Sequence, residues 1–411
     1  MVNKRLLLIT YAFSPLQAPE AYLAAKSLSK LQNFDVDVLT LNISSLGLPE
    51  DRSLDEFISK NFGVIYRAMP PKWLKKSLFN FLRYFSFFPD RFSFLNHCIV
   101  KAAAELDVKR YDVILSWSQW HSIHLAANVI AKKYPSVRWV AHMSDPWADN
   151  PFLPKIFLVR WIQRLMERIV IKAADSIHFT TIETRNLVMK NYPKVFLEKV
   201  NIFPHVYVSD LYPKRNFVIR PKAYWTIRYL GNFYGPRNPK IFAKVIARIQ
   251  SFYPEILEGV KIEFIGRWIG FPSWGPKDEG VQGDVITFKS PVNYLDSLKL
   301  MRAADLLLII DAPFEDDKNV FFPSKLVDYI GAETPILAIT PPGACAEIVN
   351  KVGGIVVPAN SCELLEEGLR LAIQKMKLGL INPPNSSIGF QYEATYVAQF
   401  YDNLLLKLTQ N

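Results

Sequence analysis

The residues best suited to binding an anion lie in the C-terminal third of this 411-residue chain. Pro323 and Ser324 come directly before Lys325. Proline fits the first turn of a helix and a serine hydroxyl can cap free backbone amides, so this order predicts a helix start. A helix start attracts anions, Lys325 adds full positive charge, and the carboxylate of Asp328, one turn later, should face the same side. Phosphates at one end and hydroxyls at the other describe a nucleoside diphosphate.

A second group of candidates lies in the stretch 229–239, where a predicted strand leads into two glycines and an arginine. Gly231 and Gly235 permit close approach of the backbone to a ligand, with Asn232 between them. The forked guanidinium of Arg237 can hold phosphate oxygens. The two glycines are too far apart for a dinucleotide-binding turn. We therefore predict a loop that grips a diphosphate; an ordinary strand-to-helix turn with a solvated arginine is the alternative.

The segment 320–340 resembles the donor-binding segment of two-domain retaining glycosyltransferases, in particular glycosyltransferase family 4. There an acidic residue is followed by a helix and then by a strand led by proline, and the acid binds the donor ribose. The resemblance gives this role to Asp328 and places Ser324 at the donor as well. This chain has Val320 where the family usually has a first glutamate, and an aspartate where it has the second. An ordinary helix and strand of an α/β sheet is the alternative.

The resemblance also implies roles for three charged residues near the donor. Arg237 and Lys325 would stabilise the departing diphosphate, so that no metal ion or other cofactor is needed. Two positioned cations and helix-end amides can perform this task. Glu347, in a segment that is similar to one near the donor in the family, would be a further donor contact; the first turn of an ordinary helix explains it equally well.

In the N-terminal half, the segments 116–125 and 142–147 resemble parts of polysaccharide-assembly glycosyltransferases. The match implies that His124 begins a helix and, like Ser144, contacts the acceptor or the sugar, and that Asp145 orients the acceptor or the donor sugar. Ser144 stands where many relatives have a histidine that contacts the donor. Ser14 lies in the loop after the first predicted strand, at the ligand-binding edge of an α/β sheet. Without the family's paired glycines, this loop is expected to serve the acceptor or the other domain.

The order of predicted elements indicates an α/β protein. A strand at 5–11, a helix at 18–31 and a strand at 36–41 open a parallel sheet, and the same alternation restarts at 225–230. We predict two Rossmann-like doubly wound lobes: an acceptor domain at 1–212 and a donor domain at 213–388. The architecture that the resemblance implies is GT-B, with the lobes facing across a cleft and the last helix, within 389–411, crossing back to the first lobe.

Composition and net charge limit the classes of binding partner but do not identify one. A formal charge of +11 and a pI near 9.3 favour an anionic partner. The stretch Trp73–Arg83 mixes basic and aromatic residues, as lipid headgroup boundaries favour, or it is an interdomain cap with buried aromatics. We find no signature of a nucleic-acid-binding fold. The apolar run near the N-terminus is too short for a secretory signal, and no run approaches the ~20 residues of a membrane span.

Metal binding is not expected. Cys98, Cys345 and Cys362 have no metal-ligand spacing, and their lack of a paired framework suggests a reducing compartment. The polar stretch 315–318, Glu-Asp-Asp-Lys, is the nearest candidate for a short acidic metal motif, and we interpret it as a solvated loop.

These observations together predict a retaining hexosyltransferase. It would move a sugar from a nucleotide-sugar to a polysaccharide or lipid-linked precursor at the cytoplasmic face of the membrane, in lipopolysaccharide or exopolysaccharide assembly. A sugar-nucleotide epimerase of the same architecture is one alternative, and it would need paired carboxyl groups. A donor-binding but inactive partner subunit is another, and binding of nucleic acid through net charge alone is a third.

Overall fold

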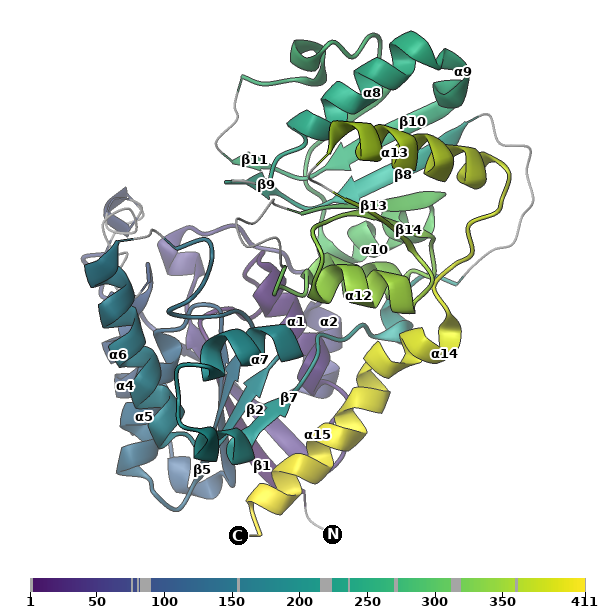
Figure 1. The fold of residues 1–411 in the computed structure, drawn as a ribbon. Helices are drawn as coiled ribbons and strands as arrows, with labels where there is room; N and C mark the ends of the chain where they lie inside the picture. The colour runs from purple at the N-terminus through teal and green to yellow at the C-terminus, as the bar shows by residue number, and fades with distance from the viewer. Residues whose placement is uncertain are drawn as a thin grey trace. The chain divides into compact units, whose positions relative to one another are not determined.

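A computed structural model describes residues 3–74, 77–79, 81, 90–153, 156–214, 224–235, 237–269, 273–311, 319–358 and 361–410. The chain divides into two compact units. Unit 1 holds Met1–Val206 and Ala394–Asn411, and unit 2 holds Tyr207–Glu393. Each unit is built on one parallel β-sheet with helices packed against it (Figure 1).

Unit 1 contains a seven-stranded sheet in the order β3-β2-β1-β4-β5-β6-β7, and every pair of neighbours is parallel. Its strands are β1 (Lys4–Ile9), β2 (Phe34–Leu41), β3 (Ile65–Ala68), β4 (Val113–Ser118), β5 (Arg138–Met143), β6 (Ser176–Phe179) and β7 (Val200–Ile202). The central strands are apolar runs because helices cover both faces, and Leu6 to Ile9 of β1 are fully buried.

The helices of unit 1 cover the sheet in two groups. They are α1 (Pro19–Leu28), α2 (Asp55–Asn61), α4 (Asn96–Ala104), α5 (Ile123–Lys133), α6 (Phe157–Ala173), α7 (Ile182–Met189) and α15 (Ala394–Leu408). Helix α5 packs between α4 and α6, whereas α1 packs beside α15 (Figure 1). The carboxylate of Asp402 on α15 accepts hydrogen bonds from the backbone amides of Gln32 and Asn33, at 2.8 and 3.3 Å. These bonds tie the C-terminal helix to the turn between α1 and β2.

Unit 2 contains a six-stranded parallel sheet in the order β12-β10-β8-β13-β14-β15. Its strands are β8 (Trp225–Leu230), β10 (Val260–Ile265), β12 (Ile286–Lys289), β13 (Leu306–Ile310), β14 (Ile336–Ile339) and β15 (Ile355–Val357), and β9 (Phe233–Tyr234) pairs separately with β11 (Trp268–Ile269). Its helices are α8 (Lys240–Phe252), α9 (Pro254–Leu257), α10 (Tyr294–Arg302), α11 (Ser324–Gly331), α12 (Ala344–Lys351), α13 (Cys362–Lys377) and α14 (Ser386–Gly389). Side-chain caps begin two of the longer helices: Asn293 accepts from the amide of Asp296, and Ser361 from that of Leu364.

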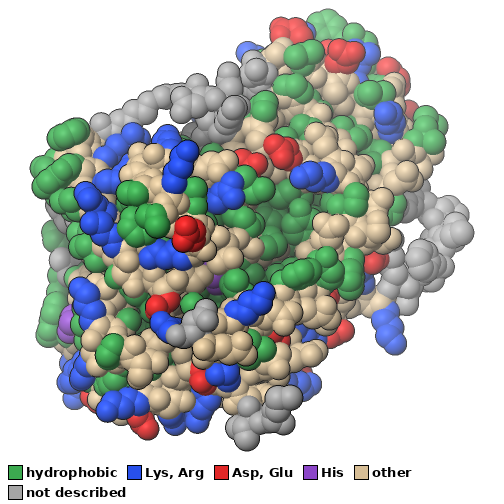
Figure 2. Space-filling view, turned by 60° about the horizontal axis from the view of Figure 1, so that its bottom comes forward, with side chains coloured by type: hydrophobic (Ala, Val, Ile, Leu, Met, Phe, Trp, Pro, Cys, Tyr) green, Lys and Arg blue, Asp and Glu red, His purple; other side chains and the backbone are tan. Residues whose placement is uncertain are grey.

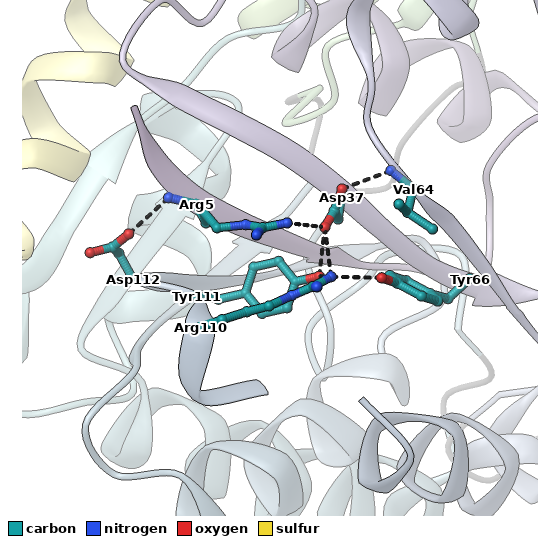
Figure 3. Close-up of polar contacts among 7 residues, drawn as sticks. All are labelled: Arg5, Asp37, Val64, Tyr66, Arg110, Tyr111 and Asp112. Carbon is teal, nitrogen blue, oxygen red and sulfur yellow. Dashed lines mark hydrogen bonds and ion pairs between the residues drawn. The ribbon is translucent and has the colours of Figure 1, made fainter. Parts of the chain in front are cut away.

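A buried aspartate ties together the strands of unit 1 (Figure 3). Asp37 on β2 is 4% exposed. Its carboxylate accepts hydrogen bonds from the guanidinium groups of Arg5 and Arg110, at 3.0 and 3.1 Å, and from the Tyr111 hydroxyl at 2.7 Å. The other oxygen accepts from the backbone amide of Val64, 2.7 Å away. Because these donors come from β1, from the chain before β3 and from the chain before β4, one carboxylate joins four segments.

The predicted fold class, two Rossmann-like α/β lobes, is confirmed by these two sheets. No helix in the described part of the chain is long and apolar enough to cross a bilayer. Figure 2 shows lysine and arginine side chains scattered singly over the face that it displays, among hydrophobic and acidic groups. On that face the positive charge is therefore not gathered into one stripe.

Candidate functional site

The predicted anion-binding residues of unit 2 meet at the carboxyl edge of its sheet. Strand β8 ends at Leu230 and is followed by Gly231, and its neighbour β13 ends at Ile310 and is followed by Asp311. Parallel strands bring their carboxyl ends to one edge, where α/β sheets bind ligands. Residues that are far apart in the sequence, including those that start α11, can therefore share one site. We call the group Gly231, Arg237, Asp311, Asn319, Lys325 and Thr340 the Lys325 cluster.

Arg237 is held in this cluster by an ion pair. Its guanidinium lies 3.1 Å from the carboxylate of Asp311, and the side chains are 12% and 2% exposed. The guanidinium also donates to the hydroxyl of Tyr234 at 3.1 Å. Burial by itself lowers the pKa of Arg237, but the paired carboxylate raises it above its ordinary value. Arg237 thus stays charged, and Asp311 fixes where that charge lies.

Lys325 places a buried amino group beside the Tyr229 ring. Its Nζ is buried and has no hydrogen-bond partner among the described residues, and it lies 3.6 Å from the centroid of the Tyr229 ring. Burial, and then repulsion from Arg237, lower the pKa of Lys325 well below its ordinary value. Gly231 leaves room for the ammonium, since a Cβ there, at a φ of +136°, would lie 2.8 Å from Nζ. An anion bound at Nζ would accept its hydrogen bonds, which no described residue does, and would supply a countercharge.

Two further polar residues complete the cluster. The second oxygen of Asp311 accepts from the Nδ2 of Asn319 at 2.8 Å and from the hydroxyl of Thr340 at 3.0 Å. The thiol of Cys345 lies beside them, and burial and then Asp311 raise its pKa. Sequence reasoning assigned no role to these residues. The signal available was that Asp311 and Thr340 directly follow apolar strands, where a polar side chain reaches the ligand-binding edge.

The other predicted donor residues lie around this cluster in different settings. Helix α11 begins at Ser324 as predicted, but its side chain does not cap the helix. Asp328 is buried, and its carboxylate accepts from the hydroxyl of Tyr294 on α10 at 2.8 Å. Asn232 is exposed and accepts from the backbone amide of Arg267, 2.9 Å away.

Two predicted donor residues have open surroundings. Gly235 has a φ of +56°, in the left-handed region, and a Cβ there would meet no atom within 4 Å. Glu347 on α12 is 57% exposed and lies 4.0 Å from Lys351 on the next helical turn. Among the described residues, neither forms a hydrogen bond or ion pair with the Lys325 cluster.

A second cluster, in unit 1, brings two carboxyl groups together at the carboxyl edge of the sheet. Asp145, after β5, accepts from the side-chain amide of Gln119 at 2.9 Å. Glu20, in the first turn of α1, accepts from the indole nitrogen of Trp117 at 3.1 Å. The hydroxyl of Ser144 lies 2.9 Å from the same Glu20 oxygen. We call these five residues the carboxyl cluster.

Burial makes Glu20 a carboxyl that binds its proton tightly. Its Oε2 accepts hydrogen bonds from the Ser144 hydroxyl at 2.9 Å and from the Trp117 indole at 3.1 Å. These bonds favour the carboxylate, but burial and then the charge of Asp145 outweigh them and raise the pKa of Glu20 to about 8.

The structure thus finds a titratable residue that sequence reasoning missed. The sequence alone assigns no role to Glu20. Its partners Trp117 and Ser144 are 97 and 124 residues away along the chain. No local pattern signals such a contact.

Two predicted acceptor residues are engaged inside unit 1. His124 is fully buried, with its Nδ1 2.8 Å from the hydroxyl of Ser116, and burial lowers its pKa well below the ordinary value. Ser14 is 7% exposed, and its hydroxyl donates to Asp55 of α2 at 3.2 Å. Both side chains are buried and make contacts inside unit 1.

Other predicted features fall partly outside the described residues. The acidic stretch 315–318 lies outside them, and in the described part no group of three or more His, Cys, Asp or Glu is arranged to hold a metal ion. Of the stretch Trp73–Arg83, residues 75, 76, 80, 82 and 83 also lie outside. Trp73 is 62% and Phe81 58% exposed, whereas Leu74 and Phe79 are buried. The aromatics of this stretch are therefore divided between surface and core.

Comparison with solved structures identifies the architecture. HepE of Anabaena, solved with UDP and glucose, superposes with a TM-score of 0.69 at 13% identity, over 98% of this chain and 100% of that chain. Sucrose-phosphate synthase of Thermosynechococcus elongatus has a TM-score of 0.69 at 13% identity, over 99% and 100%. A UDP-N-acetylglucosamine 2-epimerase has a TM-score of 0.60 at 12% identity, over 100% and 98%. No protein-family model matches the chain, and comparison with curated protein sequences finds no match.

These likenesses establish the fold, which is the two-domain GT-B fold of glycosyltransferases, as the sequence motifs predict. Membership of family 4 stays a prediction. Since an epimerase shares the architecture, the fold alone does not select the reaction, and the site must do so.

Proposed function

We propose that this protein is a retaining glycosyltransferase that takes a hexose from a nucleotide-sugar, with UDP-glucose as the first donor to test. The observation that supports this best is the buried Lys325 ammonium, which has no hydrogen-bond partner among the described residues and lies beside the ion-paired Arg237. Two fixed cations at the start of a helix match the two charges of a diphosphate. HepE, which shares the fold, is solved with UDP.

The chemistry follows from the charge that develops on the leaving group. As the bond between the sugar C1 and the diphosphate oxygen breaks, negative charge grows on the diphosphate. Lys325 and Arg237 stabilise that charge, and they need not reorganise because Tyr229 and Asp311 already hold them. The acceptor oxygen forms the new bond to C1, and its proton moves to the departing phosphate oxygen. In this scheme no metal and no protein base is required.

The remaining residues would bind and orient the substrates. Asp328, whose carboxylate accepts from the Tyr294 hydroxyl, binds the donor ribose. The carboxyl cluster of unit 1 binds acceptor hydroxyls, with Asp145 accepting and the protonated Glu20 donating hydrogen bonds. The acceptor in this proposal is a lipid-linked polysaccharide precursor at the cytoplasmic face of the membrane.

Donor binding is the first test. UDP, ADP, GDP and CDP, and their glucose derivatives, are titrated into the full chain by calorimetry. A matched pair of variants then isolates the site: Arg237→Met removes a buried ion-paired arginine in the Lys325 cluster. Arg228→Met removes a similarly buried arginine of β8, 13% exposed and 2.6 Å from Glu263. Loss of a bidentate phosphate contact should weaken nucleotide binding by roughly 10- to 100-fold in the first variant only. Equal binding by both variants would contradict the assignment.

An epimerase is the second candidate, because the carboxyl cluster offers what that reaction needs. Glu20 and Asp145 are paired carboxyl groups with a pKa near neutrality on one of them. Product analysis separates the two: an epimerase converts a UDP-sugar without an acceptor, whereas a transferase consumes an acceptor and releases UDP. The anomeric configuration of the product, measured by proton NMR, decides between retention and inversion. Tight UDP binding with neither activity would indicate a binding subunit.

A further inference from the structure

Helix α6 (Phe157–Ala173) displays its large apolar residues to solvent. Phe157 is 83%, Trp161 51%, Leu165 41% and Ile169 45% exposed, and Leu158 beside them is 58% exposed. The first four recur every four residues, so they form one continuous stripe along the helix. Figure 1 shows α6 at the periphery of unit 1, beside α5.

Two polar residues of the same helix point inward. Gln163 and Glu167 are 0% and 1% exposed. Gln163 accepts a hydrogen bond from the indole of Trp147, and Glu167 accepts from the amide of Ala148 at 3.0 Å and the hydroxyl of Tyr192 at 2.6 Å. These bonds fix the rotation of the helix about its axis. The helix therefore cannot turn its apolar stripe inward without breaking buried polar contacts.

Positive charge accompanies the stripe. Arg168 and Lys172 are exposed within it, and the only acidic residue of the helix, Glu167, faces inward. Aromatic and aliphatic side chains interleaved with basic groups suit the boundary between lipid headgroups and acyl chains. A second protein would need a matching acidic and apolar surface. The net charge of +11 opposes association of two copies of this chain through this basic face.

We propose that the outer face of α6 binds the surface of an anionic lipid bilayer, with the helix lying in the plane of the interface. At about 1.5 Å per residue, its 17 residues extend about 25 Å along that plane. Phe157, Trp161 and Leu165 enter the acyl boundary, and Arg168 and Lys172 contact lipid phosphates. This surface differs from the stretch Trp73–Arg83 that composition singled out.

The location of α6 connects this surface to the carboxyl cluster. The loop from Asp145 to α6 is bonded to the helix through Trp147 and Ala148, and Asp149 pairs with Arg164 of the helix. A bilayer bound at α6 would thus contact the helix to which Trp147, Ala148 and Asp149, just after Asp145, are bonded. Only this consequence, presentation of a membrane-borne acceptor, rests on the proposed function; binding to lipid does not.

The test is co-sedimentation of the full chain with vesicles. Vesicles of phosphatidylcholine containing phosphatidylglycerol are compared with vesicles of phosphatidylcholine alone. The double variant Phe157→Ser/Trp161→Ser removes two apolar anchors, and Phe252→Ser removes a similarly exposed phenylalanine, 69% exposed, at the end of α8 in unit 2. Loss of each large apolar contact should lower partitioning by about tenfold or more. The control should bind as the wild type does, and preference for anionic vesicles should disappear in Arg168→Gln/Lys172→Gln.

The outcomes are distinct. Thermal unfolding verifies that each variant folds, and the charge variant replaces the apolar one if the latter does not. UDP binding, measured in parallel, should be the same in all of them. Vesicle binding that survives both α6 variants but is lost in Trp73→Ser overturns the proposal in favour of the other stretch. The proposal is also overturned if the wild-type protein binds no vesicles and light scattering shows it to be a dimer that Phe157→Ser/Trp161→Ser converts to a monomer. If neither the wild type nor any variant binds UDP, the proposed function is contradicted, but the proposal that α6 binds lipid is not.

Discussion

Replacing Lys325 by methionine should make the free protein more stable and the nucleotide complex weaker. The Lys325 Nζ is buried without a hydrogen-bond partner in the described part of the chain. Removing an ammonium from water without pairing it costs several kcal/mol. Its position 3.6 Å from the Tyr229 ring centroid returns only about 2 kcal/mol of that cost. Methionine keeps the length and packs against the ring. We expect Lys325→Met to raise the free energy of unfolding by about 1–3 kcal/mol, or about 2–4 °C in midpoint for each kcal/mol.

The same substitution should weaken UDP binding by roughly 10- to 150-fold, because a hydrogen bond to a charged group contributes about 1.5–3 kcal/mol. The pH dependence has a definite sign. Burial and Arg237 lower the pKa of Lys325 in the free protein, and a bound diphosphate raises it again. UDP binding should therefore take up protons and weaken as the pH rises.

Calorimetry in two buffers of different ionisation enthalpy measures both the affinity and the proton uptake, and denaturant unfolding measures the stability. Lys261→Met is the matched control, since that lysine lies 3.8 Å from the Tyr224 ring centroid but is exposed. It should change neither nucleotide affinity nor proton uptake. If Lys325→Met lowers stability and leaves UDP affinity intact, the lysine is a structural partner of Tyr229 and the reasoning is refuted.

Three further substitutions test other parts of the structure. Burial and then a neighbouring carboxylate raise the pKa of Glu20 to about 8, so the folded protein keeps a proton that the unfolded chain loses above its usual pKa of ~4.3. The free energy of unfolding of the wild type should therefore fall as the pH rises between these two pKa values. Relative to the wild type, Glu20→Gln should gain at least about 2 kcal/mol of unfolding free energy between pH 5 and pH 9. If the difference between the two proteins does not change with pH, Glu20 is ionised throughout. Asp37→Asn should cost about 1.5–3 kcal/mol of unfolding free energy, because the buried carboxylate loses its charged hydrogen bonds to two partly exposed arginines. Asp35 on the same strand is exposed, so Asp35→Asn should be nearly neutral, and similar losses in both variants would deny Asp37 its role. Gly231→Ala forces a Cβ to within 2.8 Å of the Lys325 Nζ at a φ of +136°. It should therefore lower the free energy of unfolding by about 1–3 kcal/mol and weaken UDP binding. Unchanged UDP affinity in calorimetry would show that the close approach is dispensable.

Several elements were predictable from local sequence because their causes are local. Apolar runs such as Leu6 to Ile9 must be buried on both faces, which requires a parallel sheet covered by helices. The order of proline, serine and lysine at 323–325 likewise indicated a helix start, and α11 begins at Ser324. The cationic types of Arg237 and Lys325 pointed to an anion before any contact was known.

The contacts of those residues could not be predicted, because sheet order, not sequence distance, determines which strand ends meet. Arg237 meets Asp311 across 74 residues only because β8 and β13 are neighbours. Glu20 became a candidate through Ser144, 124 residues away, and its raised pKa depends on burial that no local motif reports.

Helix α6 shows the same division between sequence and structure. Apolar and polar residues alternate along Phe157–Ala173 with the period of an amphipathic helix. Periodicity defines two faces but does not say which is buried, and the usual assumption places the apolar face inward. Here hydrogen bonds hold Gln163 and Glu167 inward, and four large apolar side chains face outward. The chain by itself determined its α/β class, its helix starts and its charged candidates. The tertiary structure decided which charges are paired, which proton is retained and which face is exposed, because these depend on neighbours that only folding brings together.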